Sequence, residues 1–193
     1  MSNSGYDFCI GTDNPRLGRA ITGMLNGAGF YSSGTSKNVS GLLRTLRTIQ
    51  PWLAVIDTAL PPGNIEHLAS IIENDGLSAA VYINTTGIDL DLYVQLKWPV
   101  DAPVLTAVAE AVCNEFAHKK KLQQEIADLQ RKLGQRKQIE KAKGLIAEYF
   151  KLNEDQAYHL LRKASMEQSI SLATLARHII EEPAYLVALS PHR

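Results

Sequence analysis

Lysine and arginine are concentrated in one stretch of the sequence, where their charge could hold a polyanion. Residues 118–151 contain ten lysines and arginines but four acidic residues, although the whole chain has no net charge. The first 104 residues have the opposite bias, with six basic and nine acidic residues. Because clustered cations attract polyanions, we expect a polyanionic partner for the second half. A merely solvated helix face is the alternative.

Acidic and hydroxyl residues stand at the ends of strand-like apolar runs in the first half. Asp13 follows the run "YDFCIG", Asp57 ends "WLAVID" and Thr85 ends "AAVYINT". In an open parallel sheet, ligands and catalytic groups sit beyond the carboxyl ends of the strands. We therefore expect a functional site around these three side chains.

The elements that would position these residues alternate between strand and helix signals. Residues 14–30 place Leu17, Ile21, Met24 and Leu25 on one helical face and then close with glycines. Short buried strands separated by amphipathic helices predict βαβ units. Residues 1–104 should thus form an α/β domain, a mostly parallel sheet with helices on both faces.

This order of residues resembles the response-regulator receiver domain, a flavodoxin-like fold, over about residues 5–115. In that family an acidic pair after the first strand binds magnesium, and an aspartate at the end of the third strand accepts a phosphoryl group. The resemblance puts Asp57, in "IDTALPPGN", in the phosphoacceptor position. It puts Thr85 in the position of a hydroxyl residue and Asp13 in the acidic pair.

Two groups that handle charge in that family are changed here. Thr12 replaces one carboxylate of the acidic pair, and Trp98 replaces a lysine that precedes a proline, with Lys97 one residue early. A divalent cation with fewer carboxylate ligands loses affinity, and loss of the lysine removes a charge that would hold the phosphoryl group. We therefore expect a pseudo-receiver that serves as a docking or dimerising platform and needs no cofactor.

Two alternatives stay open for this domain. A working receiver would be phosphorylated on Asp57 and would hold Mg²⁺ with Asp13 and Asp57, whereas in an unrelated α/β domain Asp57 would be a loop or capping residue. The spacing from Thr85 to Trp98, 13 residues, is short for a helix and a strand. We therefore expect the fourth receiver helix to be shortened or missing.

The segment from about residue 104 to 150 lacks proline and predicts one long helix. Its apolar residues recur at spacings of three and four, first at Leu105, Val108 and Val112 and then at Leu122, Ile126, Leu129 and Leu133. This seam predicts a coiled-coil linker over residues 105–134 and a parallel or antiparallel homodimer. A single amphipathic helix folded back onto the first domain is the alternative.

The chain from residue 139 onward contains three short amphipathic segments. Asn153 can cap the second, with Glu154 and Asp155 in its first turn, Ser171 can cap the third, and Pro183 would stop it. A small core is expected from the apolar residues Ile139, Ala142, Ile146, Ala157, Leu160, Leu161, Ala164, Leu172, Leu175, Ala176, Ile179 and Ile180.

This segment resembles the ANTAR domain, an RNA-binding module of transcription antitermination regulators, over about residues 134–183. The matching residues are Ile139, Ala142-Lys143-Gly144, Leu145, the turn before "NEDQAY", Leu161-Arg162, Ser165-Met166 and the "LATLARHII" block. The whole chain is similar in arrangement to the amidase-operon and nitrate-assimilation antiterminators. The resemblance implies an all-α, three-helix RNA-binding bundle, which we place at residues 135–193.

RNA hairpins are commonly recognised through loop bases that stack on aromatic or guanidinium planes, with phosphates paired to cations. Candidates for stacking are Tyr149, Tyr158 and Arg162, although both tyrosines could equally be core residues with wet hydroxyls. Candidates for phosphate contact are Arg136, Lys137, Lys141, Lys143 and Lys163.

Gly144 is an unusual residue inside a helix, where glycine costs about 1 kcal/mol relative to alanine. Without a Cβ it would let a facing helix or an RNA loop approach the backbone, between Lys141 and Lys143. We expect tight helix packing at Ala142 and Gly144, and we keep Gly144 as an RNA-binding candidate. For Lys143 we expect a phosphate contact, because a lysine is hard to accommodate in a core.

These features predict a regulator and not an enzyme, since we find no nucleophile and base pair, phosphate loop or metal cluster. The ANTAR resemblance implies binding to hairpins of a leader transcript, which prevents terminator formation. Because the receiver site departs from its family at Thr12 and Trp98, we expect control by a partner protein or a ligand. A phosphorelay regulator activated at Asp57 by a sensor kinase is the alternative. An interaction adaptor without an RNA partner is the third hypothesis.

Two further expectations concern the chain's environment. Cys9 and Cys113 fall in apolar segments, so we expect buried free thiols. We find no basic segment followed by an apolar run at the N-terminus and no apolar stretch of membrane-spanning length. We therefore expect a cytoplasmic protein that makes no membrane contact.

Overall fold

The computed structural model describes residues 5–62, 64–87, 94–182 and 184–188. The chain forms two compact units, Met1–Leu122 and Gln123–Arg193. The first is an α/β unit and the second is helical, and each has a hydrophobic core of its own. The helix α4 (Ala102–Phe150) contributes residues to both units.

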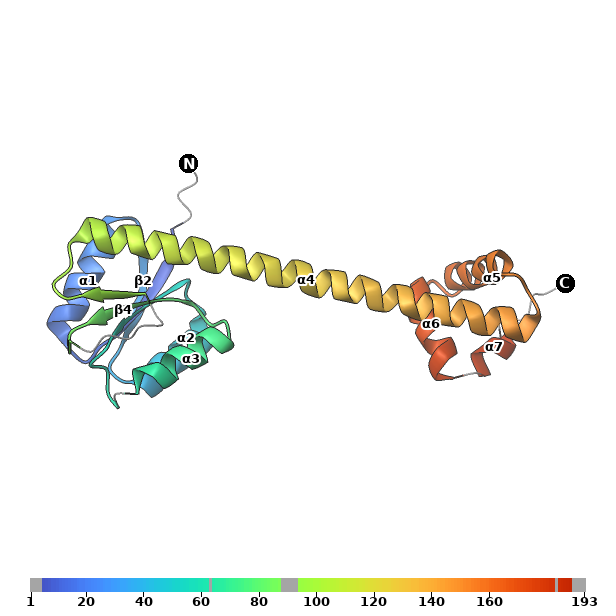
Figure 1. Cartoon of the computed structure of the whole chain (residues 1–193), viewed down its shortest axis with the longest axis horizontal. Helices are drawn as coiled ribbons and strands as arrows, with labels where there is room; N and C mark the ends of the chain where they lie inside the picture. Colours follow the sequence, from blue (N-terminus) through green and yellow to red (C-terminus); the bar gives the residue numbers. More distant parts are fainter. Residues whose placement is uncertain (1–4, 63, 88–93, 183, 189–193) are drawn as a thin grey trace. The chain divides into compact units, whose positions relative to one another are not determined.

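The N-terminal unit is built on a parallel sheet, as predicted. Its described strands are β1 (Asp7–Gly11), β2 (Tyr31–Ser36), β3 (Leu53–Asp57), β4 (Ala79–Asn84) and β5 (Gln95–Lys97), in the spatial order β2-β1-β3-β4-β5. Figure 1 shows this sheet with its helices. β3 lies in the middle, and its register pairs Ile56 with Gly11 of β1 and with Tyr82 of β4. The carboxyl ends of β1, β3 and β4 therefore meet at one edge of the sheet.

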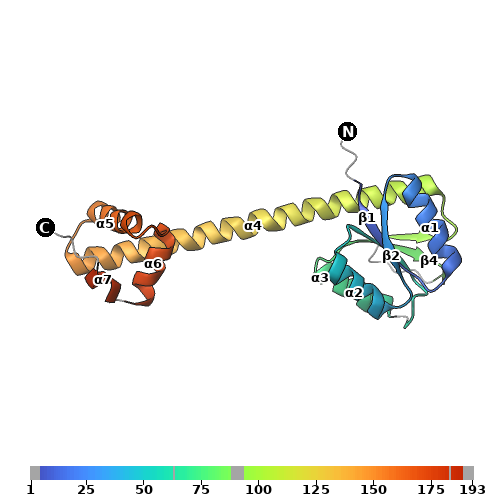
Figure 2. The ribbon, with the colours of Figure 1, turned by 180° about the vertical axis from the view of Figure 1, so that it is seen from behind.

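Helices cover both faces of this sheet. On one face, α1 (Pro15–Gly27) and the first turns of α4 pack on a cluster that contains Phe8, Ile10 and Val55. On the other face, α2 (Val39–Ile49) and α3 (Ile65–Asn74) lie side by side and pack on Ala54 and Ile56 (Figure 2). Because every residue of β3 is buried, this strand reads in the sequence as an unbroken apolar run.

The apolar seam predicted along α4 lies in two different environments. Leu105 is fully buried in the core of the N-terminal unit, and Val108 and Val112 pack against the same cluster. These residues therefore cover the sheet of their own unit. The seam is exposed further along, where Leu122, Ile126, Leu129 and Leu133 are between 45% and 64% exposed.

The fourth receiver helix, which we expected to be shortened or missing, would fall largely within residues 88–93. These residues lie outside the described part of the chain. On either side of them β4 and β5 pair in parallel, with Asn84 opposite Lys97. The predicted parallel pairing therefore extends to the last described strand.

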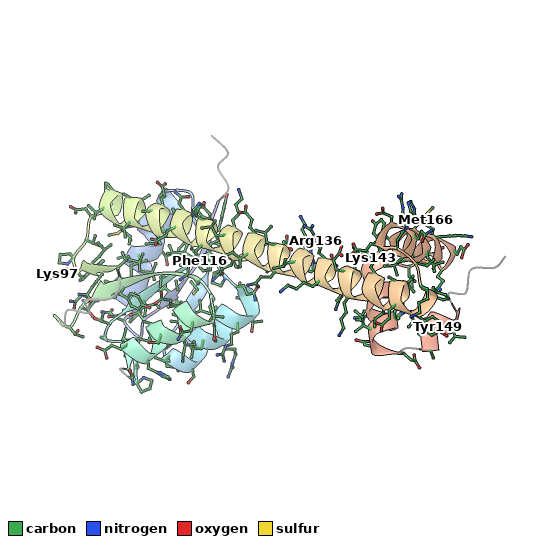
Figure 3. All side chains as sticks on the ribbon, turned by 45° about the vertical axis from the view of Figure 1, so that its right-hand side comes forward. Lys97, Phe116, Arg136, Lys143, Tyr149 and Met166 are labelled. Carbon is green, nitrogen blue, oxygen red and sulfur yellow. The ribbon has the colours of Figure 1, made fainter. Side chains whose placement is uncertain are left out.

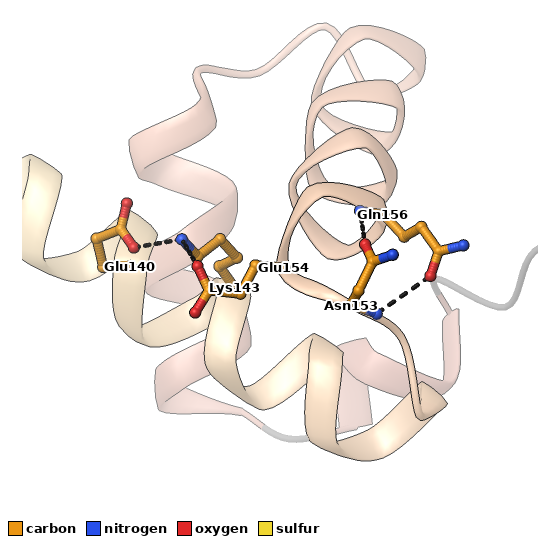
Figure 4. Close-up of polar contacts among 5 residues, drawn as sticks. All are labelled: Glu140, Lys143, Asn153, Glu154 and Gln156. Atoms are coloured by element: carbon orange, nitrogen blue, oxygen red, sulfur yellow. Dashed lines mark hydrogen bonds and ion pairs between the residues drawn. The ribbon is translucent and has the colours of Figure 1, made fainter.

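The helical unit follows the predicted three segments. The end of α4, α5 (Glu154–Glu167) and α6 (Leu172–Glu181) enclose a core that contains all twelve predicted apolar residues, and the short helix α7 (Ala184–Ala188), which we did not predict, adds Leu186. Asn153 caps α5 in a capping box with Gln156 (Figure 4), and Ser171 caps α6. Each cap satisfies a backbone N–H that the first helical turn leaves without a partner.

Both cysteines are buried and free, as predicted. Cys9, on β1, belongs to the core cluster on the face covered by α2 and α3, and Cys113, on α4, belongs to the cluster on the other face. Burial raises the pKa of each thiol to about 12. Among the described residues, no helix combines the length and the apolar character needed to span a bilayer.

Candidate functional site

Asp57 lies at the carboxyl end of β3 in a closed network of hydrogen bonds. It is 3% exposed. Its Oδ2 accepts a hydrogen bond of 2.8 Å from the hydroxyl of Thr12, and its Oδ1 accepts from the hydroxyl of Thr85 and, at 3.0 Å, from the backbone N–H of Ala59. Both carboxylate oxygens therefore already have hydrogen-bond donors from within the N-terminal unit, as buried polar groups usually do.

Thr12 takes part in this network from the end of β1, where the receiver resemblance expects a carboxylate. It is 2% exposed, and its Oγ1 also accepts from the backbone N–H of Asn14. The neighbouring Asp13 is exposed and belongs to no group of three potential ligands in the described residues. With Thr12 in place of one carboxylate, fewer charged ligands are available to a divalent cation at this edge of the sheet.

The region that follows β5 brings no described cation to Asp57. Trp98 packs against the core cluster of its own unit, and Lys97 is exposed on the last residue of β5. None of the ion pairs between described residues involves Asp57. The carboxylate is thus held by neutral donors alone.

A small basic pocket lies in the helical unit between α4 and α6. Lys137, Lys141 and Arg177 line it, together with Gln138, Ile180 and Glu181, around a volume of about 230 Å³. The three cations are exposed, and none of them forms an ion pair with another described residue. Two of them, Lys137 and Lys141, were predicted phosphate contacts. A pocket with three unpaired cations and one acid can bind a phosphate group.

Lys143 lies apart from this pocket and is held by two carboxylates of its own unit. Its Nζ is 2.6 Å from an oxygen of Glu140 and 3.0 Å from one of Glu154, and its side chain is 15% exposed (Figure 4). The hydrogen bonds to Glu140 and then to Glu154 raise its pKa. We expected a phosphate contact because a lysine is hard to place in a core; the structure shows that one ion pair within α4 and one between α4 and α5 accommodate it.

Gly144 faces open space. A Cβ built on this residue would meet no atom within 4 Å, and the residue is exposed, whereas Ala142 is fully buried in the helical core. The expected tight packing at Gly144 is therefore wrong. Of the two residues, Ala142 lies on the face of α4 that α5 and α6 cover, and Gly144 does not. The glycine leaves a bare stretch of helix backbone on the surface.

The remaining predicted contacts are spread over the surface of the helical unit. Tyr149 and Tyr158 are 53% and 39% exposed, so the interpretation of both as core residues is wrong. Figure 3 shows that Tyr149, Arg136 and Met166 project from their helices. Arg136 and Arg162 are exposed, and Lys163 is 3.9 Å from Glu167. None of these residues lines the basic pocket.

Two features of the sites were not found in the sequence. Arg177 was missed, although Lys137 and Lys141 are spaced i and i+4 on α4 and Arg177 directly follows the buried Ala176 on the helix that packs there. The hydrogen bond from Thr12 to Asp57 was missed because we considered only the carboxylate that Thr12 replaces. In both cases the sequence did contain a signal, because each residue is adjacent in the chain to one that we had already assigned to a core or a site.

Comparison with known families identifies part of the helical unit. Residues 127–180 match the family model of the ANTAR domain. The match begins within α4 and ends in α6, so it contains the basic pocket except for Glu181. No curated protein sequence matched the chain.

The N-terminal unit has structural neighbours among receiver domains. The signal receiver domain of a protein described as a Luxo repressor from Vibrio parahaemolyticus superposes with a TM-score of 0.54 at 12% identity, covering 61% of this chain and 97% of that domain. The receiver domain of the response regulator NarL from Mycobacterium tuberculosis gives 0.51 at 12% identity, covering 57% and 97%. A CheY-like receiver domain from Methylobacillus flagellatus gives 0.51 at 19% identity, covering 56% and 99%. At these identities the likeness shows the fold alone.

Proposed function

We propose that this chain, which joins a receiver-fold domain to an ANTAR domain, is an RNA-binding transcription antitermination regulator. Its ANTAR domain would bind hairpins in a leader transcript and prevent a terminator from forming. The observation that carries the proposal is that the ANTAR match covers the three unpaired cations of the basic pocket. Both parts are regulatory in kind, so we propose no catalytic activity.

Phosphates of the RNA are expected in the basic pocket, against Lys137, Lys141 and Arg177. Exposed aromatic side chains and a guanidinium would stack on loop bases, and Tyr149, Tyr158 and Arg162 are available for this. Gly144 offers bare backbone on the same helix as Tyr149. Lys143 could reach a phosphate only if it left Glu140 and Glu154, so we give it a smaller part than the pocket.

A homodimer would present two such modules together. The exposed residues Leu122, Ile126, Leu129 and Leu133 follow a heptad spacing, and burying them against a second copy would remove apolar surface from water. Two linked modules that engage two hairpin loops gain affinity through effective concentration. The exposed seam therefore supports a coiled-coil dimer as part of this function.

Control of the RNA module is proposed to work without phosphorylation. A receiver site that binds magnesium and accepts phosphate needs room for both beside the acceptor carboxylate. The hydroxyls of Thr12 and Thr85 and the N–H of Ala59 occupy the oxygens of Asp57 instead. This arrangement supports a pseudo-receiver that responds to a partner protein or to a ligand.

The RNA proposal is tested by titrating the full chain with paired-hairpin leader RNAs and with loop-substituted controls at several salt concentrations. Replacing Lys137, Lys141 and Arg177 by glutamine should reduce the slope of log affinity against log salt by roughly 2, at about 0.7 to 0.9 for each lost phosphate contact. The matched control replaces Lys119, Lys120 and Lys132, which lie outside the pocket. Equal losses in the two triple variants, or binding without loop preference, would contradict an RNA site here.

A phosphorelay regulator is kept as the second candidate, because Thr85 does contact Asp57 as a receiver's hydroxyl residue would. Acetyl phosphate and Mg²⁺ would then modify Asp57 of the wild-type chain, which intact mass spectrometry detects as an added phosphoryl group. We expect no modification of the wild type. In Thr12→Asp, which restores the missing carboxylate, Mg²⁺ should raise the melting temperature. A wild-type chain that is modified and changes its RNA affinity would favour the second candidate.

A further inference from the structure

A cavity in the N-terminal unit lies beside the Asp57 network but does not include Asp57. It has a volume of about 640 Å³ and is lined by α1, by the end of β2 and by the residues that follow β1 and β2. This size lies within the range of roughly 300 to 1,000 Å³ that is usual for small-molecule sites. Gly18 and Gly23 of α1 belong to its lining, and a Cβ on Gly23 would meet no atom within 4 Å.

The lining of the cavity carries more positive than negative charge. Arg19 comes from α1 and Lys37 follows β2, and neither forms an ion pair with another described residue. Asp13 is the one acidic residue of the lining, so two cations face one carboxylate. The side chain of Thr35 adds a hydroxyl, and most of the remaining lining is apolar. Unpaired cations at an apolar cavity favour a ligand that carries one negative charge on an apolar body.

Thr12 belongs to the wall of this cavity and also to the Asp57 network. Its methyl group lies on the side of Gly18, while its hydroxyl donates to Asp57. A molecule in the cavity would therefore contact a residue that holds the carboxylate at the end of β3. The cavity and the network share this one side chain.

We propose that this cavity binds a small organic anion, with its charged group between Arg19 and Lys37 and its apolar part along α1. The cavity shares Thr12 and Asp13 with the position of the receiver's acidic pair, but neither Asp57 nor Thr85 lines it, and Arg19, Lys37 and α1 lie outside that site. The binding step is independent of the RNA proposal. Only the further consequence, that the anion is the ligand controlling the RNA module, rests on the proposed function.

The test uses two fluorescent probes of similar shape, the anion 8-anilinonaphthalene-1-sulfonate and the neutral N-phenyl-1-naphthylamine. The full chain is titrated with each in the absence of RNA, so a failure of the RNA proposal does not affect the result. Gly23→Phe adds a large side chain at a residue of the lining whose Cβ would meet no atom within 4 Å. Gly27→Phe is its matched control, because Gly27 lies on the same helix, also has open space at its Cβ position and does not line the cavity.

We expect saturable binding of the sulfonate that Gly23→Phe weakens by about tenfold or more and Gly27→Phe leaves unchanged. Arg19→Gln combined with Lys37→Gln should weaken the sulfonate to a similar extent, with little effect on the neutral probe. Arg16→Gln, on the same helix outside the cavity, is the control for charge. Absence of saturable binding, or equal binding by Gly23→Phe and the wild type, would overturn the proposal. Equal losses for both probes in the charge variant would overturn its anion specificity.

Discussion

Asp57 and Lys141 are both charged residues at predicted sites, and their surroundings differ. Asp57 is buried, and both of its oxygens accept hydrogen bonds from its own domain. Lys141 is exposed in a pocket whose other cations are also without ion pairs to described residues. A charge that is satisfied inside the protein gains little from a ligand, whereas unpaired cations gain when an anion arrives. Local hydrogen bonding thus separates a structural charge from one available for binding.

If two ANTAR domains bind RNA together as a dimer, substitutions in the exposed seam of α4 should reduce RNA affinity more than any other change. Ile126→Glu with Leu129→Glu places like charges at the proposed dimer contact, so we expect a monomer by analytical ultracentrifugation. Affinity for a paired-hairpin RNA should then fall by about a hundredfold or more, because avidity is lost.

The matched control for the seam variant is Gln124→Glu with Ala127→Glu. These two residues lie on the same helix away from the seam, and the variant also adds two negative charges. Unchanged sedimentation of the seam variant would show that the seam is not a dimer contact. A monomer that keeps full RNA affinity would separate dimerisation from binding.

Removal of the buried carboxylate should affect stability and leave RNA binding intact. Asp57→Ala leaves the hydroxyls of Thr12 and Thr85 without their acceptor, which should lower the free energy of unfolding by about 1 to 3 kcal/mol. Urea denaturation followed by tryptophan fluorescence measures this, since both tryptophans lie in the N-terminal unit. Asp75→Ala, at an exposed ion pair with Arg47, is the control and should change it by less than about 0.5 kcal/mol. A gain in stability for Asp57→Ala would indicate a strained receiver site.

Gly144→Ala should move stability and binding in opposite directions. The added Cβ meets no neighbour, so the helical unit should gain about 1 kcal/mol, measured by thermal unfolding at 222 nm. If RNA approaches this backbone, its affinity should fall. Gly134→Ala, also at an open position of α4, should give a similar gain in stability with unchanged RNA affinity. Unchanged affinity in Gly144→Ala would remove this glycine from the proposed contact.

Lys143 should show the smallest effect, and its effect should depend on pH. The pKa of Lys143 is raised by Glu140 and Glu154, so its stabilising contribution is complete below the unfolded pKa of about 10.4 and is lost as the pH rises through the higher folded pKa. Lys143→Met should therefore melt at a lower temperature than the wild type at pH 8, with the difference narrowing above about pH 10.5. Lys163→Met, at a longer exposed pair, should show little difference at either pH. A difference that persists at high pH would point to packing and not to charge.

Much of the fold could be predicted from the sequence because it depends on the spacing of apolar residues and on the residues that cap helices. The unbroken apolar run of β3 marks a strand buried on both faces, and Asn153 and Ser171 mark the starts of α5 and α6. Each of these signals is local. The short helix α7 after α6 has only five residues and gives no comparable periodic pattern.

The sites were harder to predict because they depend on which residues meet across elements. Lys137 and Lys141 were predicted as phosphate contacts from their charge, but Arg177 joins them only through the packing of α6 on α4. Lys143 directly precedes the exposed Gly144 on α4, but its side chain lies between the carboxylates of Glu140 and Glu154. The substitution at Thr12 suggested a lost function, whereas its hydroxyl makes a contact of its own.

The two buried cysteines give this protein a built-in reporter of partial opening. Only thiolates react readily with alkylating reagents, and a pKa of about 12 leaves almost no thiolate at neutral pH while burial blocks access. Cys9 and Cys113 belong to the cores on opposite faces of the sheet. Labelling of Cys113 before Cys9 would therefore mean that the first turns of α4 leave the sheet while α2 and α3 stay in place, and equal rates would mean that the unit opens as a whole.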